Sequence, residues 1–286
     1  MEIGRLGGIH WFHKATALVL GTHNISRRAW LLGSGTLLCA TAGALWGAEA
    51  AWPDERATGV FRCHADFSLA PFADLIEELG RLQDDLVTDL EIAEPREEVH
   101  LFLFERKSTY QAYLNQYFPK VPARRALFIK GRGPGMVFAY RSAELAVDVR
   151  HEGTHALLHA SISDLPLWLD EGLAEYYEVP SADRAAKNPY CSGVRWNVRL
   201  GYVPGLAKLE ALRDLPDMGK NEYRDAWAWT HFLLHHSDDT RAVLRNYLRQ
   251  LADDQSPGDL SDQLRRRVPA PEAAFTEHFR RWGASK

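Results

Sequence analysis

The sequence predicts an α+β fold with a small sheet in its front half and helices in its back half. Three apolar runs typical of buried strands lie at residues 60–69, 99–104 and 136–140. Between these runs apolar residues recur at helical spacing, and from about residue 142 onward the helical pattern dominates. We therefore expect one mature domain over residues 51–286, with an α+β part over 51–141 and a mainly helical part over 142–286.

The front half alternates strands with amphipathic helices. Residues 71–90 place an apolar side chain at every third or fourth position, which is the period of a helix that buries one face. These side chains are Phe72, Leu75, Ile76, Leu79, Leu82, Leu86 and Leu90. Ser108 can cap a second helix that runs to Phe118. A turn rich in glycine at residues 131–135 then leads into the third strand.

The back half is a series of helices. Ser142 can cap a helix that runs to about residue 160, and Pro166 marks the first turn of the next helix, which carries Glu171. Residues 188–205 contain Pro, Gly, Trp and Tyr without a clear period, so we expect a long ordered loop there. Further helices are expected over residues 223–235, 241–251 and 273–282.

Composition and charge are those of a globular protein. The chain has 286 residues, of which 46% are apolar and 25% are charged, so it can bury a core without disulfides or a structural metal. Its formal net charge is −4 and it has no long basic block, so we expect no nucleic-acid partner. The three cysteines, Cys39, Cys63 and Cys191, form no C-x-x-C pair, which excludes a thiolate zinc knot. Cys63 and Cys191 are either a disulfide, if the protein is exported, or two buried thiols.

The N-terminal segment has the pattern of an export signal. Arg27 and Arg28 precede an uncharged run over residues 31–48, which ends at the small-residue site Ala48-Glu49-Ala50. A positive flank, an apolar run and such a site together predict a secretory signal, here of the twin-arginine type. The run is also about long enough to span a bilayer uncleaved. We expect residues 1–50 to be an export signal of a periplasmic or extracellular protein, or else a membrane anchor.

The residues that point to chemistry begin with His151-Glu152-Gly153-Thr154-His155. Residues four apart on a helix point in nearly the same direction, so His151 and His155 can bind one ion from one helical turn. Glu152 lies on the same side and can reach a water on that ion without binding the ion itself. The pattern H-E-x-x-H thus predicts two zinc ligands and a general base. His159 extends the ladder but is expected to be an ordinary helix-end residue.

A third ligand is expected on the next helix. A catalytic zinc takes three protein ligands and leaves one position open. A helix packed antiparallel against the first can bring Glu171 to the ion, and the turn between the two helices has the length of a helical hairpin. Gly172 directly follows. A glycine costs about 1 kcal/mol relative to alanine in a helix interior, and close approach of two helices would explain it.

The two motifs together resemble those of the gluzincin peptidases. H-E-x-x-H is followed by W-L-x-E-G-x-A-E-Y from Trp168 to Tyr176, in the style of uncharacterised bacterial gluzincin-like families. The resemblance implies a zincin-like fold, Zn²⁺ as cofactor, Glu171 as third ligand, and a peptide or protein substrate. It also implies that Glu175 holds the other ring nitrogen of the first zinc histidine, because such a ligand needs an acceptor to fix it.

The same resemblance suggests a residue that stabilises the oxyanion. Residues 222–227 resemble the start of a family helix whose tyrosine donates a hydrogen bond to developing charge, and this tyrosine corresponds to Tyr223. Ala226 stands where the family often has glycine, and Tyr202 and His231 are alternative donors. In zincins the strand before the site helix often lies along the cleft. Residues 135–140 are therefore expected either as an edge strand that pairs with substrate or as an internal strand.

Taken together, these patterns predict a zinc-dependent hydrolase, in particular a metallopeptidase. Glu152 would be its general base, and Tyr223 or a neighbour would stabilise the intermediate. The alternatives are a non-catalytic zinc-binding envelope module and an envelope-anchored interaction protein without metal. The presence of Glu152 favours hydrolysis, because structural zinc does not need that residue.

Overall fold

The computed structural model describes residues 18–19, 52–131 and 133–282. The expected export signal over residues 1–50 lies outside the described residues, apart from the short strand β1 (Leu18–Val19). Within the described part, no helix combines the length and the apolar character that crossing a bilayer requires.

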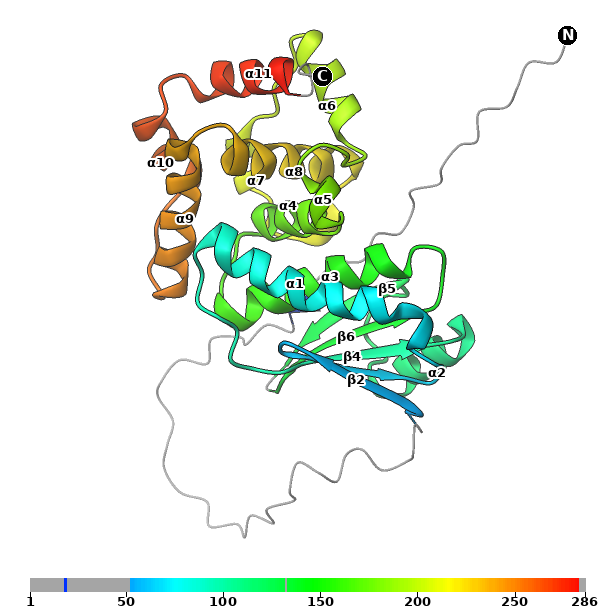
Figure 1. Ribbon diagram of the computed structural model, residues 1–286. Coiled ribbons are helices and arrows are strands. Elements are labelled where there is room, and N and C mark those ends of the chain that lie inside the picture. Colours follow the sequence, from blue (N-terminus) through cyan, green and yellow to red (C-terminus); the bar gives the residue numbers. More distant parts are fainter. Residues whose placement is uncertain (1–17, 20–51, 132, 283–286) are drawn as a thin grey trace, which may run out of the picture.

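A six-stranded mixed sheet forms one layer of the protein (Figure 1). The strand order is β1-β5-β6-β4-β3-β2. The strands after β1 are β2 (Asp54–Thr58), β3 (Phe61–Ala65), β4 (Val99–Phe104), β5 (Ala126–Lys130) and β6 (Gly135–Tyr140). Strands β3, β4 and β6 run parallel, whereas β2 pairs antiparallel with β3, and β5 pairs antiparallel with β6. β1 pairs in parallel with β5 at Ile129 and Lys130.

The position of β6 decides between the two roles expected for residues 135–140. β6 lies inside the sheet, between β5 and β4, so the expectation of an edge strand is wrong and the internal alternative is confirmed. Its outer neighbour, β5, is a strand that the sequence pattern did not indicate. Strand order depends on pairing between segments far apart in the chain, and a local pattern does not contain it.

Alternate residues of the strands point to opposite faces of the sheet and build two cores. Leu101 and Leu103 of β4 belong to the main core, whereas Phe102 and Phe104 face a smaller cluster that includes residues of α2 (Lys107–Tyr117). On the opposite face α1 (Ala73–Leu90) contributes buried leucines at helical spacing to the main core. The two helices expected in the front half are thus confirmed.

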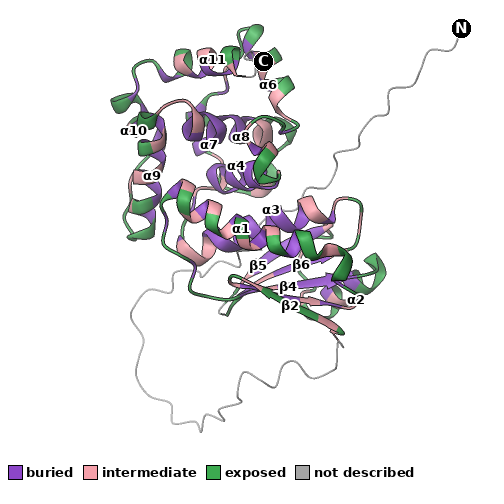
Figure 2. Ribbon diagram, in the orientation of Figure 1, coloured by how far each residue is buried: buried purple, intermediate pink, exposed green. Residues whose placement is uncertain are grey.

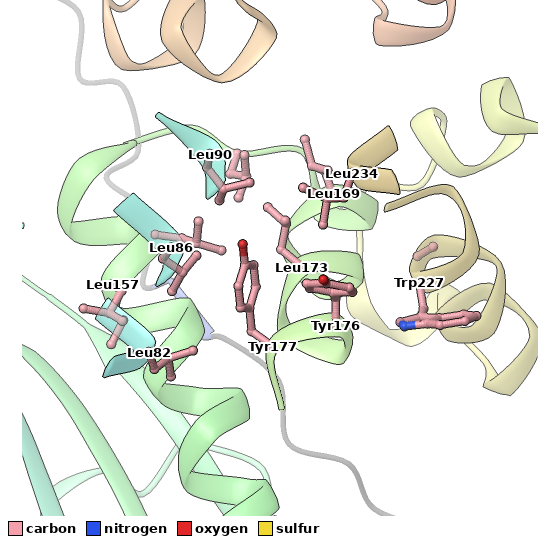
Figure 3. Packing of buried hydrophobic residues seen from close by; sticks show 14 of the residues in the cluster. Leu82, Leu86, Leu90, Leu157, Leu169, Leu173, Tyr176, Tyr177, Trp227 and Leu234 are labelled. Atoms are coloured by element: carbon pink, nitrogen blue, oxygen red, sulfur yellow. The ribbon is translucent and has the colours of Figure 1, made fainter. Parts of the chain in front are cut away.

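The main core continues from the sheet into the helical half. α3 (Leu145–Ser161) packs on β5 and β6, and α4 (Leu167–Tyr177) contacts both α3 and α8 (Lys220–His235). Leu86 of α1, Leu157 of α3 and Tyr177 of α4 belong to the same core cluster, part of which Figure 3 shows from close by. The neighbouring Tyr176 reaches α8, where its hydroxyl lies 2.8 Å from His235 Nε2. Figure 2 shows α3, α4 and α8 as largely buried helices.

Shorter elements complete the chain. They are the 3-10 helices η1 (Ala70–Phe72) and η2 (Leu215–Asp217), and the helices α5 (Ser181–Arg184), α6 (Cys191–Arg199), α7 (Leu206–Glu210), α9 (Asp238–Ala252), α10 (Leu260–Arg267) and α11 (Pro271–Arg281). The expectation of a loop over residues 188–205 is wrong in its centre, because α6 lies there. Its buried residues are Val194 and Val198, and one such i, i+4 pair is too short a pattern to reveal a helix. Cys63 and Cys191 are free thiols, so the disulfide alternative is wrong.

Candidate metal centre

Three of the predicted site residues come from one stretch of α3. This helix contacts β5, β6, α1 and α4, and most of its side chains are therefore buried. His151, Glu152 and His155 have at most 2% of their surface exposed. Their common direction follows from the helical period, as the sequence spacing predicts.

α4 brings Glu171 to the same point. The Nε2 atoms of His151 and His155 lie 3.2 Å apart, and Glu171 Oε2 lies 3.6 Å from the first and 3.8 Å from the second. Ligand atoms about 2.0–2.2 Å from a tetrahedral zinc ion lie about 3.3–3.6 Å from one another. The three predicted ligand atoms are thus close to the spacing of three vertices of a zinc tetrahedron, and the fourth vertex is left for another ligand.

The charges at this point favour a cation. Both carboxylate oxygens of Glu171 and both of Glu152 are buried and accept no hydrogen bond of normal geometry. Burial raises the pKa of both side chains well above the usual range. The neighbouring carboxylate of Asp148 raises the pKa of Glu152 further, and that of Asp170 raises the pKa of Glu171 further. Buried carboxylates without partners are costly. A divalent ion among these atoms would supply the missing positive charge, so the residues present fit a zinc ion.

A carboxylate on the far side of each imidazole orients it. His155 Nδ1 lies 2.8 Å from Asp170 Oδ1, and His151 Nδ1 lies 3.0 Å from Glu178 Oε2. A ring that donates its Nδ1–H to a carboxylate presents an unprotonated Nε2 to the centre, which is the form that binds a metal. We expected Glu175 to hold His151. Glu178, at the C-terminal end of α4, occupies that position, while Glu175 is buried beside His151 and Glu178.

His159 also takes part in this network, which the sequence analysis missed. Its Nε2 lies 3.0 Å from Asp170 Oδ2, and its ring stacks on Phe128 of β5. Burial alone would raise the pKa of Asp170, but the imidazoles of His155 and His159 hold it well below its usual range. One charged carboxylate therefore bridges a predicted ligand and a second histidine. The ladder of three histidines on α3 and the acid directly before Glu171 were the signals that could have revealed it.

Gly172 permits the close packing that places Glu171. A β-carbon at Gly172 would lie 2.4 Å from Thr230 Oγ1 and 2.7 Å from the backbone oxygen of Ala226, both on α8. The close helix–helix approach expected at this glycine is confirmed, and α8 is the partner helix.

The three candidate oxyanion donors, Tyr223, Tyr202 and His231, have different surroundings in the structure. Tyr223 lies in the first turn of α8, half-buried against the main core. The hydroxyl of Tyr202 donates to Asp225 Oδ2 at 2.7 Å. The His231 ring is buried between His278 and the backbone oxygen of Ala185, at 3.0 and 2.9 Å. Both alternatives to Tyr223 are thus engaged with residues outside the metal centre.

Comparisons with known proteins add little to this geometry. No family model matches the chain, and no curated protein matches it. Among solved structures it is similar to an M1 zinc metallopeptidase from Deinococcus radiodurans, with 18% identity and a TM-score of 0.47. A point variant of that enzyme gives 19% identity and a TM-score of 0.45. In both comparisons 79% of this chain is covered, and the chain spans 50% of the other protein. Similarity at this level does not show what the chain does.

Proposed function

We propose that this chain is a zinc-dependent metallopeptidase. The observation that carries the proposal is the meeting of three metal-ligand atoms, from His151, His155 and Glu171, beside the buried carboxylate of Glu152. A site for structural zinc needs no such carboxylate, whereas hydrolysis needs a base next to the open ligand position.

His151, His155 and Glu171 would hold the ion, with Asp170 and Glu178 fixing the two imidazoles. The chemistry that zinc supplies in such a site is activation of a water molecule and polarisation of a carbonyl group. A low-dielectric environment strengthens these effects, and all three ligand side chains are buried.

The proton transfers are proposed for Glu152. Its carboxylate follows His151 directly in α3 and accepts no hydrogen bond of normal geometry, so it is available to receive a proton from an attacking water. It would then deliver that proton to the leaving amine. Tyr223 is proposed as the donor to the oxyanion, because it lies on the helix that packs against α4 and its two rivals are engaged elsewhere. An exported or membrane-anchored location remains part of the proposal and rests on residues 1–50 alone.

Zinc content and peptide turnover of the purified full-length protein test the proposal. We expect one zinc ion per chain, lost in His151→Ala, and hydrolysis of a peptide library that disappears in Glu152→Gln while zinc remains. The exposed Glu94 offers a matched control, and Glu94→Gln should retain turnover. Hydrolysis that survives in Glu152→Gln would remove the assigned base. Zinc without any turnover would favour the non-catalytic envelope module, and absence of zinc would refute both.

A further inference from the structure

Large apolar side chains are exposed at the C-terminal end of α6. Trp196 is 60% exposed, Leu200 70% and Tyr202 46%, and these are three of the four exposed large hydrophobic side chains in the described part of the chain. Trp196 and Leu200 are four residues apart, so they lie on one side of the helix. Val194 and Val198 are buried on the opposite side. α6 therefore packs through its valines and presents Trp196 and Leu200 to solvent.

The end of α6 is a well-defined support for these side chains. Gly201 adopts the left-handed conformation, with a φ of +83°. The amide of Tyr202 donates to the carbonyl oxygen of Asn197 at 2.9 Å, and that of Gly201 donates to Val198 at 3.1 Å, which is the Schellman motif that ends a helix. A β-carbon at Gly193, on the same exposed side, would meet nothing within 4 Å. Figure 1 shows α6 beside α11, at the end of the helical half that lies away from the sheet.

Positive charge accompanies this exposed face. Residues 188–209 contain Arg195, Arg199 and Lys208 but no Asp or Glu, in a chain whose formal net charge is −4. Arg195 and Arg199 lie one helical turn apart and form a row next to the two apolar side chains. Among the described residues, neither arginine forms an ion pair. Their charges are therefore available to a partner.

Acids on the two helices that contact α6 do not neutralise these arginines. Asp225 of α8 accepts hydrogen bonds from Tyr202 and Arg224, and Glu277 of α11 pairs with Arg281. The exposed face of α6 thus combines large apolar side chains with a net positive charge. A partner that complements it is apolar inside and negatively charged at its surface.

The size of this face favours a lipid surface over a protein. The three exposed side chains together present about 350 Å², since a large side chain has roughly 200–250 Å² in full. A stable protein interface takes about 800 Å² from each partner. A bilayer needs less, because one or two apolar side chains can enter the headgroup region, where Trp and Tyr concentrate, while arginines bind anionic headgroups.

We infer that the end of α6 docks on an anionic phospholipid bilayer, with Trp196 and Leu200 in the headgroup region and Arg195 and Arg199 on lipid phosphates. This docking is independent of peptide hydrolysis and of residues 1–50. Two cations and two apolar side chains should bind about as strongly as a single acyl chain. Half of the protein should then be bound at about 0.1–1 mM accessible lipid.

Fluorescence quenching at Trp196 tests the docking on the full-length protein. The vesicles contain phosphatidylcholine with about one third phosphatidylglycerol, and their acyl chains carry bromine, which quenches a tryptophan that enters the bilayer. Trp196→Leu keeps an apolar side chain but removes the reporter. The difference between it and the wild type therefore isolates Trp196 from all other tryptophans, including those of residues 1–50. We expect quenching of this difference signal at about 0.1–1 mM lipid, and far weaker quenching by vesicles of phosphatidylcholine alone.

Removing the two arginines should weaken the docking. Each is worth about fivefold near an anionic surface, so Arg195→Gln together with Arg199→Gln should raise the lipid concentration for half-maximal quenching about 30-fold. Arg249 and Arg266 are exposed on α9 and α10, on the other side of the helical half in Figure 1. Arg249→Gln together with Arg266→Gln is the matched control for charge and should change the value by about twofold or less.

Removing the apolar contact should weaken the docking as well. Leu200→Ser should raise the required lipid concentration about tenfold, whereas Tyr117→Ser, at the exposed tyrosine of α2, should not. Each variant is compared with the same variant carrying Trp196→Leu.

The outcomes separate a membrane from other partners. Absence of quenching at Trp196, or quenching that is equally strong without the two arginines, would overturn the docking. A dimer in analytical ultracentrifugation that Leu200→Ser dissociates, without quenching by vesicles, would instead make this face a contact between copies of the chain. No substrate is present in these measurements, so they stand whether or not the protein cleaves peptides.

Discussion

Replacing Gly172 with alanine should force helices α4 and α8 apart. The added β-carbon would lie 2.4 Å from Thr230 Oγ1 and 2.7 Å from the backbone oxygen of Ala226, whereas real β-carbons essentially never come closer than 3.0 Å. Thr230 can rotate its hydroxyl away. The oxygen of Ala226 belongs to the interior of α8, so it moves only if the helix moves.

The expected cost follows from two opposing effects. Overpacking of a buried contact costs about 1–3 kcal/mol, and a clash with helix backbone belongs at the upper end. Alanine recovers about 1 kcal/mol through its higher helix propensity. The net loss in the free energy of unfolding is therefore about 2 kcal/mol. Zinc should also bind more weakly, because Glu171 directly precedes the displaced residue.

Gly153 provides a matched control on α3. A β-carbon there would lie 3.6 Å from Phe61 and 3.7 Å from Leu79, which is ordinary van der Waals contact. Gly153→Ala should therefore leave stability unchanged or raise it by up to about 1 kcal/mol. Urea unfolding of both variants in metal-free form, followed by circular dichroism, measures the difference without a contribution from bound metal. If Gly172→Ala proves as stable as Gly153→Ala, the inferred close contact between α4 and α8 is refuted.

Three further predictions address charge and metal binding. Asp170→Asn leaves one acceptor oxygen for the two imidazoles of His155 and His159. Zinc affinity, measured by competition with a chelator, should therefore fall about 10–100-fold. An unchanged affinity would contradict the role of Asp170 as a bridge between the two imidazoles. Burial lowers the pKa of His235 to about 4 and that of His278 to about 3. As the pH drops, the unfolded chain therefore binds protons at these histidines before the folded protein does. The free energy of unfolding should fall as the pH drops from about 6.5 toward 4. Urea unfolding at several pH values measures this, and a constant free energy across the range would speak against it. Arg125→Met removes the ion-pair partner of the buried carboxylate of Asp148, so it should reduce the free energy of unfolding by about 2–3 kcal/mol. A loss below about 0.5 kcal/mol in urea unfolding would show that the ion pair is dispensable.

The parts of the site that sequence alone predicted are those fixed by a local period. His151 and His155 share a direction because they are one helical turn apart, and the neighbouring helix supplies Glu171. The strands and helices of the front half follow in the same way from runs of apolar residues. In these cases the interacting atoms lie on one element or on two joined by a short turn, so little beyond local geometry is needed.

The remaining features depend on how elements dock. Whether Glu175 or Glu178 meets His151 is decided by the angle and offset between α3 and α4, and both acids follow Glu171 at plausible helical distances. The bridge from Asp170 to His159 depends on the same docking. β5 was missed because it is a run of five residues next to charged side chains, and its place between β6 and β1 is set by long-range pairing.

The most direct test of the central claim is a crystal structure of the zinc-soaked protein with anomalous data at the zinc edge. We predict one strong peak, about 2.0–2.2 Å from the Nε2 atoms of His151 and His155 and from a carboxylate oxygen of Glu171, with the fourth position open to solvent or substrate. No peak at this point, or a zinc ion held by other residues while these three side chains diverge, would contradict the claim.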